Sequence, residues 1–311
     1  MTVKISAQDS NLADVNMRHY ISRYSAFILL FLFCGYSFGQ STVTTSCGNH
    51  CPFLVVYYPF RVTRFPDVSS KAPFTPVPEY DGWSVDRIDR DMSRISKSGL
   101  NGVLLAIEPS DLNDSHKLDM IRTFLAIASN LRSFNVAFLF APSRFTQLSR
   151  SNVSSFLKRK GLLNYSSVYR YSDNYVIFFS DNVELVAMPK PDFLYIRLDL
   201  SGSSFKDAKN SPGLIAYPST SSQSEDTLSN YRVMHIFAGL VNLSNNKYQW
   251  IVSRRNGQCF QNNLDNVLKS STELVVISSW NDYAQGSAIE NNSLDNTLMI
   301  EILMKFIKKS N

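Results

Sequence analysis

Cysteine and histidine are scarce in this 311-residue chain, which contains four of each. That scarcity excludes a disulfide-dense scaffold and leaves few ligands for a metal site built on cysteine or histidine. Cys47 and Cys51 lie close together, so they could pair with each other, or either of them could pair with Cys259. His50 between them invites a metal, but zinc needs further ligands and the other histidines stand alone in their segments. We therefore favour a disulfide and predict no metal site.

Signatures of cofactor and nucleic-acid binding are also missing. No Gly-x-Gly-x-x-Gly motif follows the first predicted strand, which argues against a dinucleotide site. The formal net charge is +5, but the lysines and arginines are scattered and form no basic stripe interleaved with aromatics. The sequence thus predicts no cofactor and no nucleic-acid partner. Hydrophobic residues make up 44% and charged residues 18%, which is typical of a globular protein.

The N-terminal apolar run is short. Residues 26–38 are uncharged and mostly apolar, but a membrane-spanning helix needs about 17–25 residues. Arg18 precedes the run, and Ser37-Phe38-Gly39 offers small residues at the spacing of a cleavage site. We predict an N-terminal extension and signal peptide over residues 1–39 of a secreted or lumenal protein. The alternative is an uncleaved signal anchor, which would make the protein a type II membrane protein like those of the Golgi. Only in that case do we expect contact with a membrane.

Five Asn-x-Ser/Thr sequons are consistent with a glycoprotein of the secretory pathway. They lie at Asn113, Asn152, Asn164, Asn242 and Asn291. Residues 40–52, which include Cys47 and Cys51, are predicted to be a linker between the signal region and the body of the protein.

Strand-like and helix-like segments alternate through the rest of the chain. The β-rich apolar runs predict strands at 53–58, 102–107, 135–140, 175–179, 193–198, 213–217, 248–252 and 274–277. Helical periodicity predicts helices from Ser84 to Gly99, over 118–131, over 153–163 and over 298–306. This alternation favours a parallel sheet with crossover helices, and eight strands in this length favour closure. We predict an α/β fold, a single (β/α)8 TIM barrel over residues 53–309.

Polar side chains follow the predicted strands, where a parallel barrel places its catalytic groups. Carboxylates at these ends include Glu108, Asp181, Asp199, Asp282 and Glu290. Glycoside hydrolysis needs two carboxyl groups on either side of one glycosidic bond. Aromatic side chains that could offer apolar faces to sugar rings are Tyr57, Tyr58, Trp83, Tyr217 and Trp280. Any one of these residues taken alone could instead cap a helix, form an ion pair or belong to the core.

Residues 280–290 read Trp-Asn-Asp-Tyr-Ala-Gln-Gly-Ser-Ala-Ile-Glu. This segment resembles the Asn-Glu-Trp-His-Glu-Gly-Thr-Gln-Ile-Glu loop of the family-99 glycoside hydrolases, the endo-α-1,2-mannosidases and their relatives. Tyr57-Tyr58-Pro59 and the segment 80–84 are similar to the first strand and first helix of that family. The resemblance covers roughly residues 53–307, and it implies a (β/α)8 barrel that acts on mannose-containing glycans.

The resemblance also implies a catalytic pair in which both positions differ from the family. The two loop glutamates, one assisting the 2-hydroxyl of the sugar and the other serving as acid and base, correspond to Asp282 and Gln285. An amide cannot donate and recover a proton as a carboxylic acid does. A polar family pattern at the third strand is replaced by apolar residues at 139–142. The residues predicted to bind substrate are Tyr57, Tyr58, Trp83, Glu108, Asp199, Tyr217, Trp280, Asn281 and Glu290.

Two functions follow from this resemblance. The first is a glycoside hydrolase-like enzyme of the secretory pathway, similar to endo-α-1,2-mannosidases, with an impaired or altered acid/base. The second is a catalytically degenerate pseudoenzyme that binds carbohydrate. The expected partner in both is a glycan or glycoprotein, and the oligomeric state is left open. A secreted barrel kept for protein contacts is a third reading.

Overall fold

The computed structural model describes residues 51–60, 73–78, 84–186, 192–198, 200, 214–216, 231–244, 247–270 and 272–310. The signal region predicted over residues 1–39 and nearly all of the linker therefore lie outside the described residues. The packing of Cα atoms divides the chain between Thr44 and Thr45, and the description below concerns the second unit alone. Among the helices of the described ranges, none combines the length and apolar character needed to cross a membrane.

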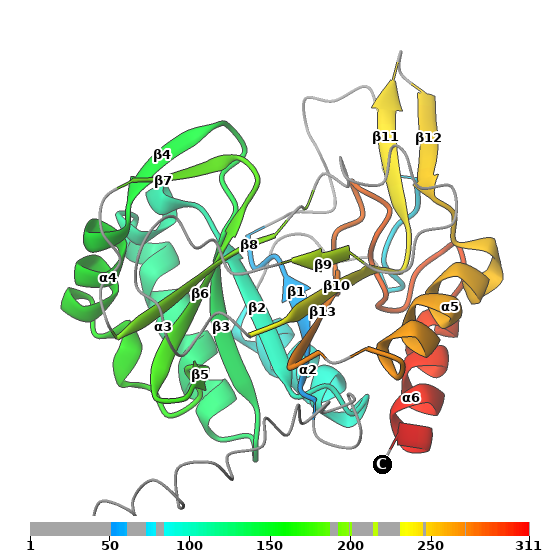
Figure 1. Ribbon diagram of the computed structural model, residues 1–311, viewed down its shortest axis with the longest axis horizontal. Coiled ribbons are helices and arrows are strands. Elements are labelled where there is room, and N and C mark those ends of the chain that lie inside the picture. The colour runs from blue at the N-terminus through cyan, green and yellow to red at the C-terminus, as the bar shows by residue number, and fades with distance from the viewer. Residues whose placement is uncertain are drawn as a thin grey trace, which may run out of the picture. The chain divides into compact units, whose positions relative to one another are not determined.

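A mostly parallel sheet forms the centre of this unit (Figure 1). Its parallel strands, in spatial order, are β8, β6, β3, β2, β1, β13 and β10. Their bounds in chain order are β1 Phe53–Tyr57, β2 Gly102–Ile107, β3 Asn135–Phe140, β6 Asn174–Ser180, β8 Phe193–Leu198, β10 Val233–Phe237 and β13 Leu274–Ser278. Two short strands pair antiparallel, β5 (Arg170–Tyr171) with β6 and β9 (Leu214–Ala216) with β10.

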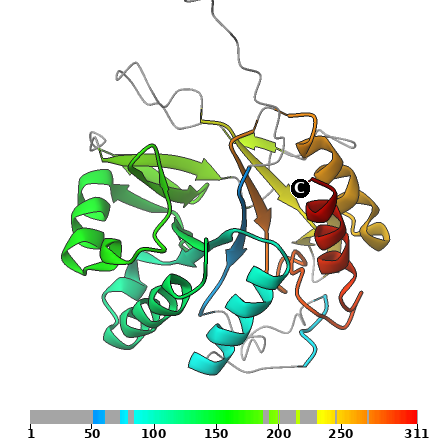
Figure 2. The same cartoon turned by 90° about the horizontal axis from the view of Figure 1, so that it is seen from below.

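Helices lie on the outer side of the strands, as the view in Figure 2 shows. The α-helices are α2 Val85–Lys97, α3 Ser115–Ser129, α4 Arg150–Arg159, α5 Gln258–Val267 and α6 Leu298–Ser310. Short 3-10 turns are η1 Pro109–Leu112, η2 Leu162–Asn164 and η4 Arg255–Gly257. The helix predicted to begin at Ser84 does so because of a side-chain cap. The Ser84 hydroxyl accepts the backbone N–H of Arg87 at 3.2 Å at the start of α2.

The sheet is buried on both faces. Along β1, Val55 and Tyr57 face the helices and belong to the larger core, whereas Leu54 and Val56 belong to a second, inner core. All seven parallel strands contribute side chains to that inner core. Parallel strands covered on both faces read as continuous apolar runs, which is why most of them could be predicted from composition.

Most of the predicted elements are confirmed, and three strands, 102–107, 135–140 and 193–198, match to the residue. The prediction at 248–252 is wrong for the sheet, because Lys247–Val252 forms β12 and pairs with β11 (Leu240–Ser244) in a separate hairpin. The strand that takes its place beside β13 is β10, which was not predicted. The strand expected over 213–217 is present as β9 but runs antiparallel.

The architecture is therefore a mixed α/β fold whose strand order matches that of a barrel. Within the described residues, β8 pairs with β6 and β9 pairs with β10, while no pairing joins β8 to β9. A closed ring of eight parallel strands consequently remains a prediction.

Two small sheets stand at the carboxyl end of the parallel strands (Figure 1). One pairs β4 (Thr146–Ser149) with β7 (Val183–Val186), which follow β3 and β6 in the chain. The other is the β11–β12 hairpin, which follows β10. Both belong to loops at the end of the sheet where barrels carry their functional groups.

Candidate functional site

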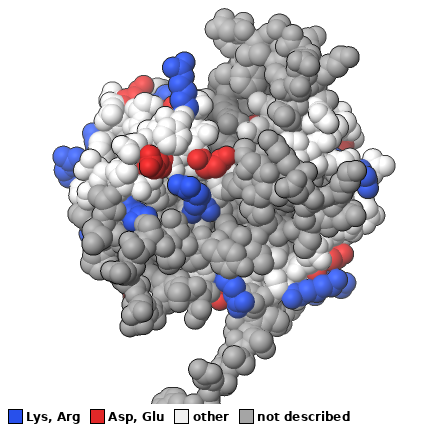
Figure 3. All heavy atoms as spheres, turned by 45° about the horizontal axis from the view of Figure 1, so that its top comes forward, with Lys and Arg blue, Asp and Glu red and all other residues white. Residues whose placement is uncertain are grey.

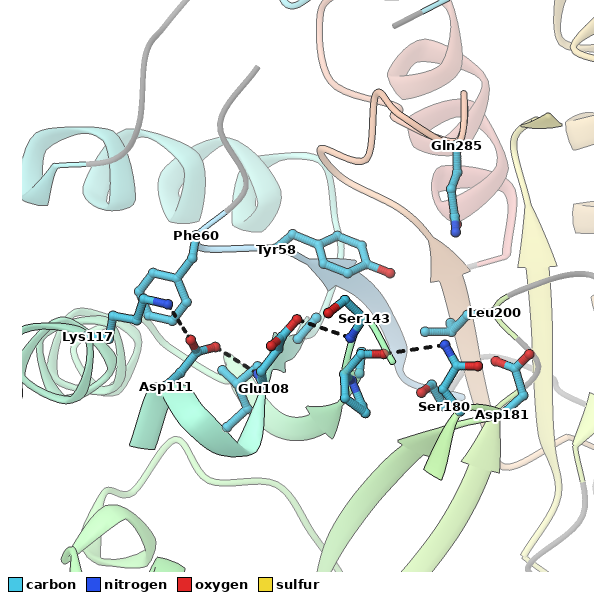
Figure 4. A pocket seen from close by; sticks show the side chains of 15 residues that line it. Tyr58, Phe60, Glu108, Asp111, Lys117, Ser143, Ser180, Asp181, Leu200 and Gln285 are labelled. Atoms are coloured by element: carbon cyan, nitrogen blue, oxygen red, sulfur yellow. Dashed lines mark hydrogen bonds and ion pairs between the residues drawn. The ribbon is translucent and has the colours of Figure 1, made fainter. Parts of the chain in front are cut away.

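A pocket with a volume of about 590 Å³ lies at the carboxyl end of the parallel sheet. Its walls come from the segments that follow β1, β2, β3, β6, β8 and β13. The lining residues are Tyr58, Phe60, Ala106, Ile107, Glu108, Asp111, Lys117, Ala141, Pro142, Ser143, Ser180, Asp181, Asn182, Leu200 and Gln285. Figure 4 shows their side chains. This is the position at which α/β barrels bind their ligands.

The wall after β2 presents a carboxylate, that of Glu108. Its Oε1 atom accepts the backbone N–H of Ser143 at 3.1 Å, which joins the ends of β2 and β3. The Glu108 backbone N–H donates to Asp111 at 2.7 Å, and Asp111 forms an ion pair with Lys117 at 2.5 Å. The lysine ammonium also lies 5.1 Å from the ring centre of Phe60. The positive charge of this wall is thus paired within the protein, and Glu108 adds a negative charge.

The walls after β3 and β6 are partly apolar. Ala141 and Pro142 end β3 without a polar side chain, as their sequence predicts, and the Pro142 carbonyl accepts from the Asn182 amide at 3.4 Å. Ser180 is 2% exposed, and its hydroxyl has no hydrogen-bond partner among the described residues. Asp181, which follows it, adds a third carboxylate to those of Glu108 and Asp111 on the pocket wall.

Gln285 enters the pocket from the loop after β13 (Figure 4). Its backbone carbonyl accepts the N–H of Val241 at 2.9 Å, so the loop is bonded to the β11–β12 hairpin. The amide side chain, the residue at the expected acid/base position, is directed toward the cavity.

Asp282 lies in the same loop but is fully buried and does not line the pocket. Its carboxylate accepts the backbone N–H of Gln285 at 3.2 Å, and its own N–H donates to the Ser279 hydroxyl at 2.8 Å. The Asp282 carbonyl accepts the N–H groups of Ser287 and Ala288. The structure therefore separates the two predicted catalytic positions, one on the pocket and one inside the turn.

Other predicted binding residues also build the loop from within. Trp280 is buried in the core on the helix side. The Asn281 side chain accepts the backbone N–H of Tyr58 at 2.9 Å and donates to its carbonyl at 3.0 Å, which joins β13 to β1. Glu290 is 2% exposed. None of these three lines the pocket, because all three side chains are buried.

The remaining predictions divide in the same way. Tyr58 and Glu108 line the pocket, and their role in substrate binding stays a prediction. Tyr57 points the other way, because strand residues alternate between faces and its hydroxyl donates to Asp91 of α2 at 2.9 Å. The residues that lie outside the described ranges are Trp83, Asp199 and Tyr217.

Several pocket residues were missed from the sequence. Phe60, Asp111 and Lys117 belong to segments without a motif, and only the folded loops bring them to the wall. Asp181 was recognised from the sequence as a carboxylate near the end of a predicted strand, but it was not included among the residues predicted to bind substrate. Position relative to a strand end was thus more informative here than residue type.

The described residues contain no group of three or more His, Cys, Asp or Glu side chains that could hold a metal ion. Cys259 is a free cysteine and forms no disulfide with Cys51, while Cys47 lies outside the described residues. Charged side chains on the face in Figure 3 are of both signs and stand apart, without a continuous basic surface in its described part.

Comparison with solved structures identifies the architecture. The GH99 endo-α-mannosidase from Bacteroides thetaiotaomicron aligns with a TM-score of 0.58 at 14% identity, over 83% of this chain and 98% of the enzyme. The chain has a GH99-like fold. The same enzyme in complex with bis-tris propane gives the same TM-score and identity, over 83% of this chain and 96% of that one. A glycoside hydrolase-like protein aligns with a TM-score of 0.52 at 12% identity, over 83% and 94% of the two chains.

Sequence comparison adds nothing to this likeness, since no family model and no curated protein matches the chain. At 12–14% identity the structural likeness concerns the fold. It confirms the GH99-like fold that the loop at 280–290 led us to expect, and it extends over nearly the whole length of the GH99 enzyme, while closure of the barrel stays a prediction.

Proposed function

We propose that this chain is a glycoside hydrolase-like protein whose pocket binds a mannose-containing glycan. The GH99-like fold supports the class, because its solved example is an endo-α-mannosidase. The pocket supports the ligand, because a tyrosine, three carboxylates and two side-chain amides line a cavity with apolar patches. Such a combination suits a sugar, which presents hydroxyl groups and apolar ring faces.

Binding without hydrolysis agrees best with the geometry. The observation that carries this choice is the placement of Gln285 on the pocket while Asp282 is buried in its turn. An amide accepts and donates hydrogen bonds but cannot act as general acid. General acid–base assistance is worth about 10²–10⁴-fold in rate, so its absence would leave little turnover of an unactivated glycan.

Hydrolysis is the second candidate, and a specific observation favours it. Glu108 and Asp181 line the same pocket from β2 and β6, and glycoside hydrolysis requires two carboxyl groups. In this alternative the two would supply the acid and the base, and Gln285 would orient the sugar.

The deciding experiment measures binding and turnover on the same protein. Calorimetry with α-1,2-mannobiose and a mannose oligosaccharide reports affinity, and an activated aryl mannoside reports hydrolysis. We expect binding without turnover, with affinity reduced about tenfold in Gln285→Ala through the loss of amide hydrogen bonds. Turnover appearing only in Gln285→Glu would indicate a degenerate active site.

Matched variants separate the two candidates. Native turnover that is lost in Glu108→Gln and Asp181→Asn, but kept in Asp192→Asn, would establish hydrolysis in place of binding alone. Asp192 is a suitable control because it precedes β8, at the amino end of the strand, and pairs there with Lys158. Absence of both binding and turnover would overturn both candidates.

We also propose that residues 1–39 direct the protein into the secretory pathway, to be secreted or lumenal, with a type II membrane anchor as the alternative. Asn113, Asn152 and Asn164 support this, because these sequon residues are exposed and accessible to glycosylation. N-terminal sequencing and an endoglycosidase mobility shift test it. A product that retains its first residues in the membrane fraction would support the anchor, and an unglycosylated cytosolic product would refute both forms.

We further propose that the sheet closes between β8 and β9 into a single barrel over residues 53–309. The inner core supports this, because all seven parallel strands contribute to one apolar cluster. A crystal structure in which β8 and β9 remain unpaired would contradict it.

A further inference from the structure

Arg254 is a buried arginine beside the loop that carries Gln285. It follows β12, is 4% exposed, and was not part of the predicted site. Its Nη1 atom donates to the carbonyl oxygens of Gly286 at 3.1 Å and Ala288 at 2.9 Å. Both carbonyls lie within three residues of Gln285, so the guanidinium holds the segment that immediately follows the pocket residue.

The Nε side of the guanidinium forms an ion pair at the end of the same loop. Arg254 Nε donates to an oxygen of Asp295 at 2.6 Å. The second oxygen of Asp295 accepts the side-chain amide of Asn292 at 2.9 Å, and that amide also donates to the Glu290 carbonyl at 2.8 Å. The charge of the arginine is thus balanced, and its partners span residues 286–295.

An aromatic cluster and the backbone at Gly239 lie close to the Arg254 side chain. The Phe74 ring centre lies 4.9 Å from the guanidinium carbon, and Phe74 packs with Tyr283 and Ala288. A Cβ atom at Gly239 would stand 2.7 Å from Arg254 Cγ and 2.8 Å from the Gly286 carbonyl oxygen. The absence of a side chain at Gly239 therefore allows the arginine to approach the loop.

We propose that Arg254 is a positioning residue that sets the place of Gln285 on the pocket wall. The inference concerns the loop itself and rests on the proposed function only where ligand affinity is the readout. Arginine is required because a planar guanidinium can serve two carbonyls and a carboxylate at once, whereas a lysine ammonium is a point charge on a flexible stem.

The test is amide hydrogen exchange by mass spectrometry on the peptide that contains residues 283–290, in the full chain. Arg254→Met keeps much of the volume and removes every donor. It is expected to speed exchange in this peptide about tenfold or more, the size expected for loss of a charge-assisted hydrogen bond. Arg254→Lys should restore part of the protection.

The matched control is Arg87→Met, which removes another buried arginine, one that pairs with Asp91 of α2 at 3.3 Å. If it lowers the stability of the whole domain, it should raise exchange in the 283–290 peptide no more than elsewhere. Should Arg254→Met fail to fold, Asp295→Asn weakens the same network and should give the same local pattern with smaller amplitude.

Affinity for the mannose oligosaccharide is the second readout. It should fall about tenfold in Arg254→Met, through loss of the Gln285 hydrogen bonds, and stay unchanged in Arg87→Met. If the native protein binds no oligosaccharide, the proposed function fails while the exchange experiment still tests the loop. Unchanged exchange in Arg254→Met, or a uniform increase across the domain, would overturn the inference.

Discussion

The carboxylate of Asp282 accepts the backbone N–H of Gln285 at 3.2 Å, although only Gln285 lines the pocket. Two neighbouring polar residues of one loop therefore have different tasks. The acid organises the turn, and the amide faces the cavity that the turn encloses.

Substitution of these two residues should affect stability to different extents. Asp282→Ala removes a fully buried side chain that bonds the turn, and we expect it to lower the free energy of unfolding by about 1–3 kcal/mol. Gln285→Ala should change it by less than about 0.5 kcal/mol, because its side chain is partly exposed. Urea unfolding followed by circular dichroism measures both. Equal losses would show that the amide also supports the turn.

Gly239→Ala should destabilise the protein although it adds only one methyl group. The new Cβ would meet Arg254 Cγ at 2.7 Å and the Gly286 carbonyl oxygen at 2.8 Å, and such overpacking costs about 1–3 kcal/mol. Gly161→Ala is the control, because its Cβ meets only an Asn164 side-chain atom at 3.6 Å. That variant pays only for its φ of +71°, typically about 1 kcal/mol. Thermal unfolding of both variants tests the difference, and a wild-type melting temperature in Gly239→Ala would contradict the packing.

The hydroxyls of Tyr169 and Tyr231 form a buried hydrogen-bonded pair in the inner core, 3.0 Å apart. Replacing either tyrosine with phenylalanine leaves the other hydroxyl buried without this bond, at a cost of about 1–3 kcal/mol. Replacing both should be nearly neutral, because no buried hydroxyl of the pair then lacks its partner. A double-mutant cycle measured by denaturant unfolding checks this. Additive losses would mean that the two hydroxyls do not depend on each other.

The pH dependence of stability should show the titration of the Asp91 carboxyl group. Burial raises the pKa of its carboxyl group above the usual value, although Arg87 and the Tyr57 hydroxyl act in the opposite direction. The folded state therefore holds this proton more tightly than the unfolded chain does. The resulting stabilisation is complete below the unfolded pKa of about 3.9 and is lost as the pH rises through the raised folded value.

Asp91→Asn removes this titration. The melting temperature of the variant, taken relative to wild type, should therefore increase from about pH 4 toward neutral pH. Calorimetry across that range gives the two curves. If the melting temperatures of the variant and of wild type change with pH in parallel, the folded state does not favour the protonated form of Asp91.

The parallel strands could largely be predicted from the sequence, because burial on both faces leaves long apolar runs such as 102–107. The sequence predicted a sheet strand at 248–252, whereas the strand that pairs with β13 is Val233–Phe237, and this error has a physical cause. The segment at 247–252 is rich in β-forming residues whether it pairs inside a sheet or in a hairpin, and composition does not distinguish the two. His235 inside β10 weakened the apolar pattern of that strand.

The site was predictable in location but not in detail. The abrupt change after Ile277 from apolar to polar residues indicated the loop that reaches the pocket. The burial of Asp282 and Trp280 could not be read from that pattern, because a turn needs polar groups for its own backbone just as a ligand does. Likewise, the alternation that sends Tyr57 to α2 and Tyr58 to the pocket needed the strand register.

The hydrogen bond from Val241 to the Gln285 carbonyl connects the base of a protruding hairpin to the wall of the cavity. A displacement of β11 would therefore move the backbone of Gln285, and with it the amide that this residue presents to the pocket.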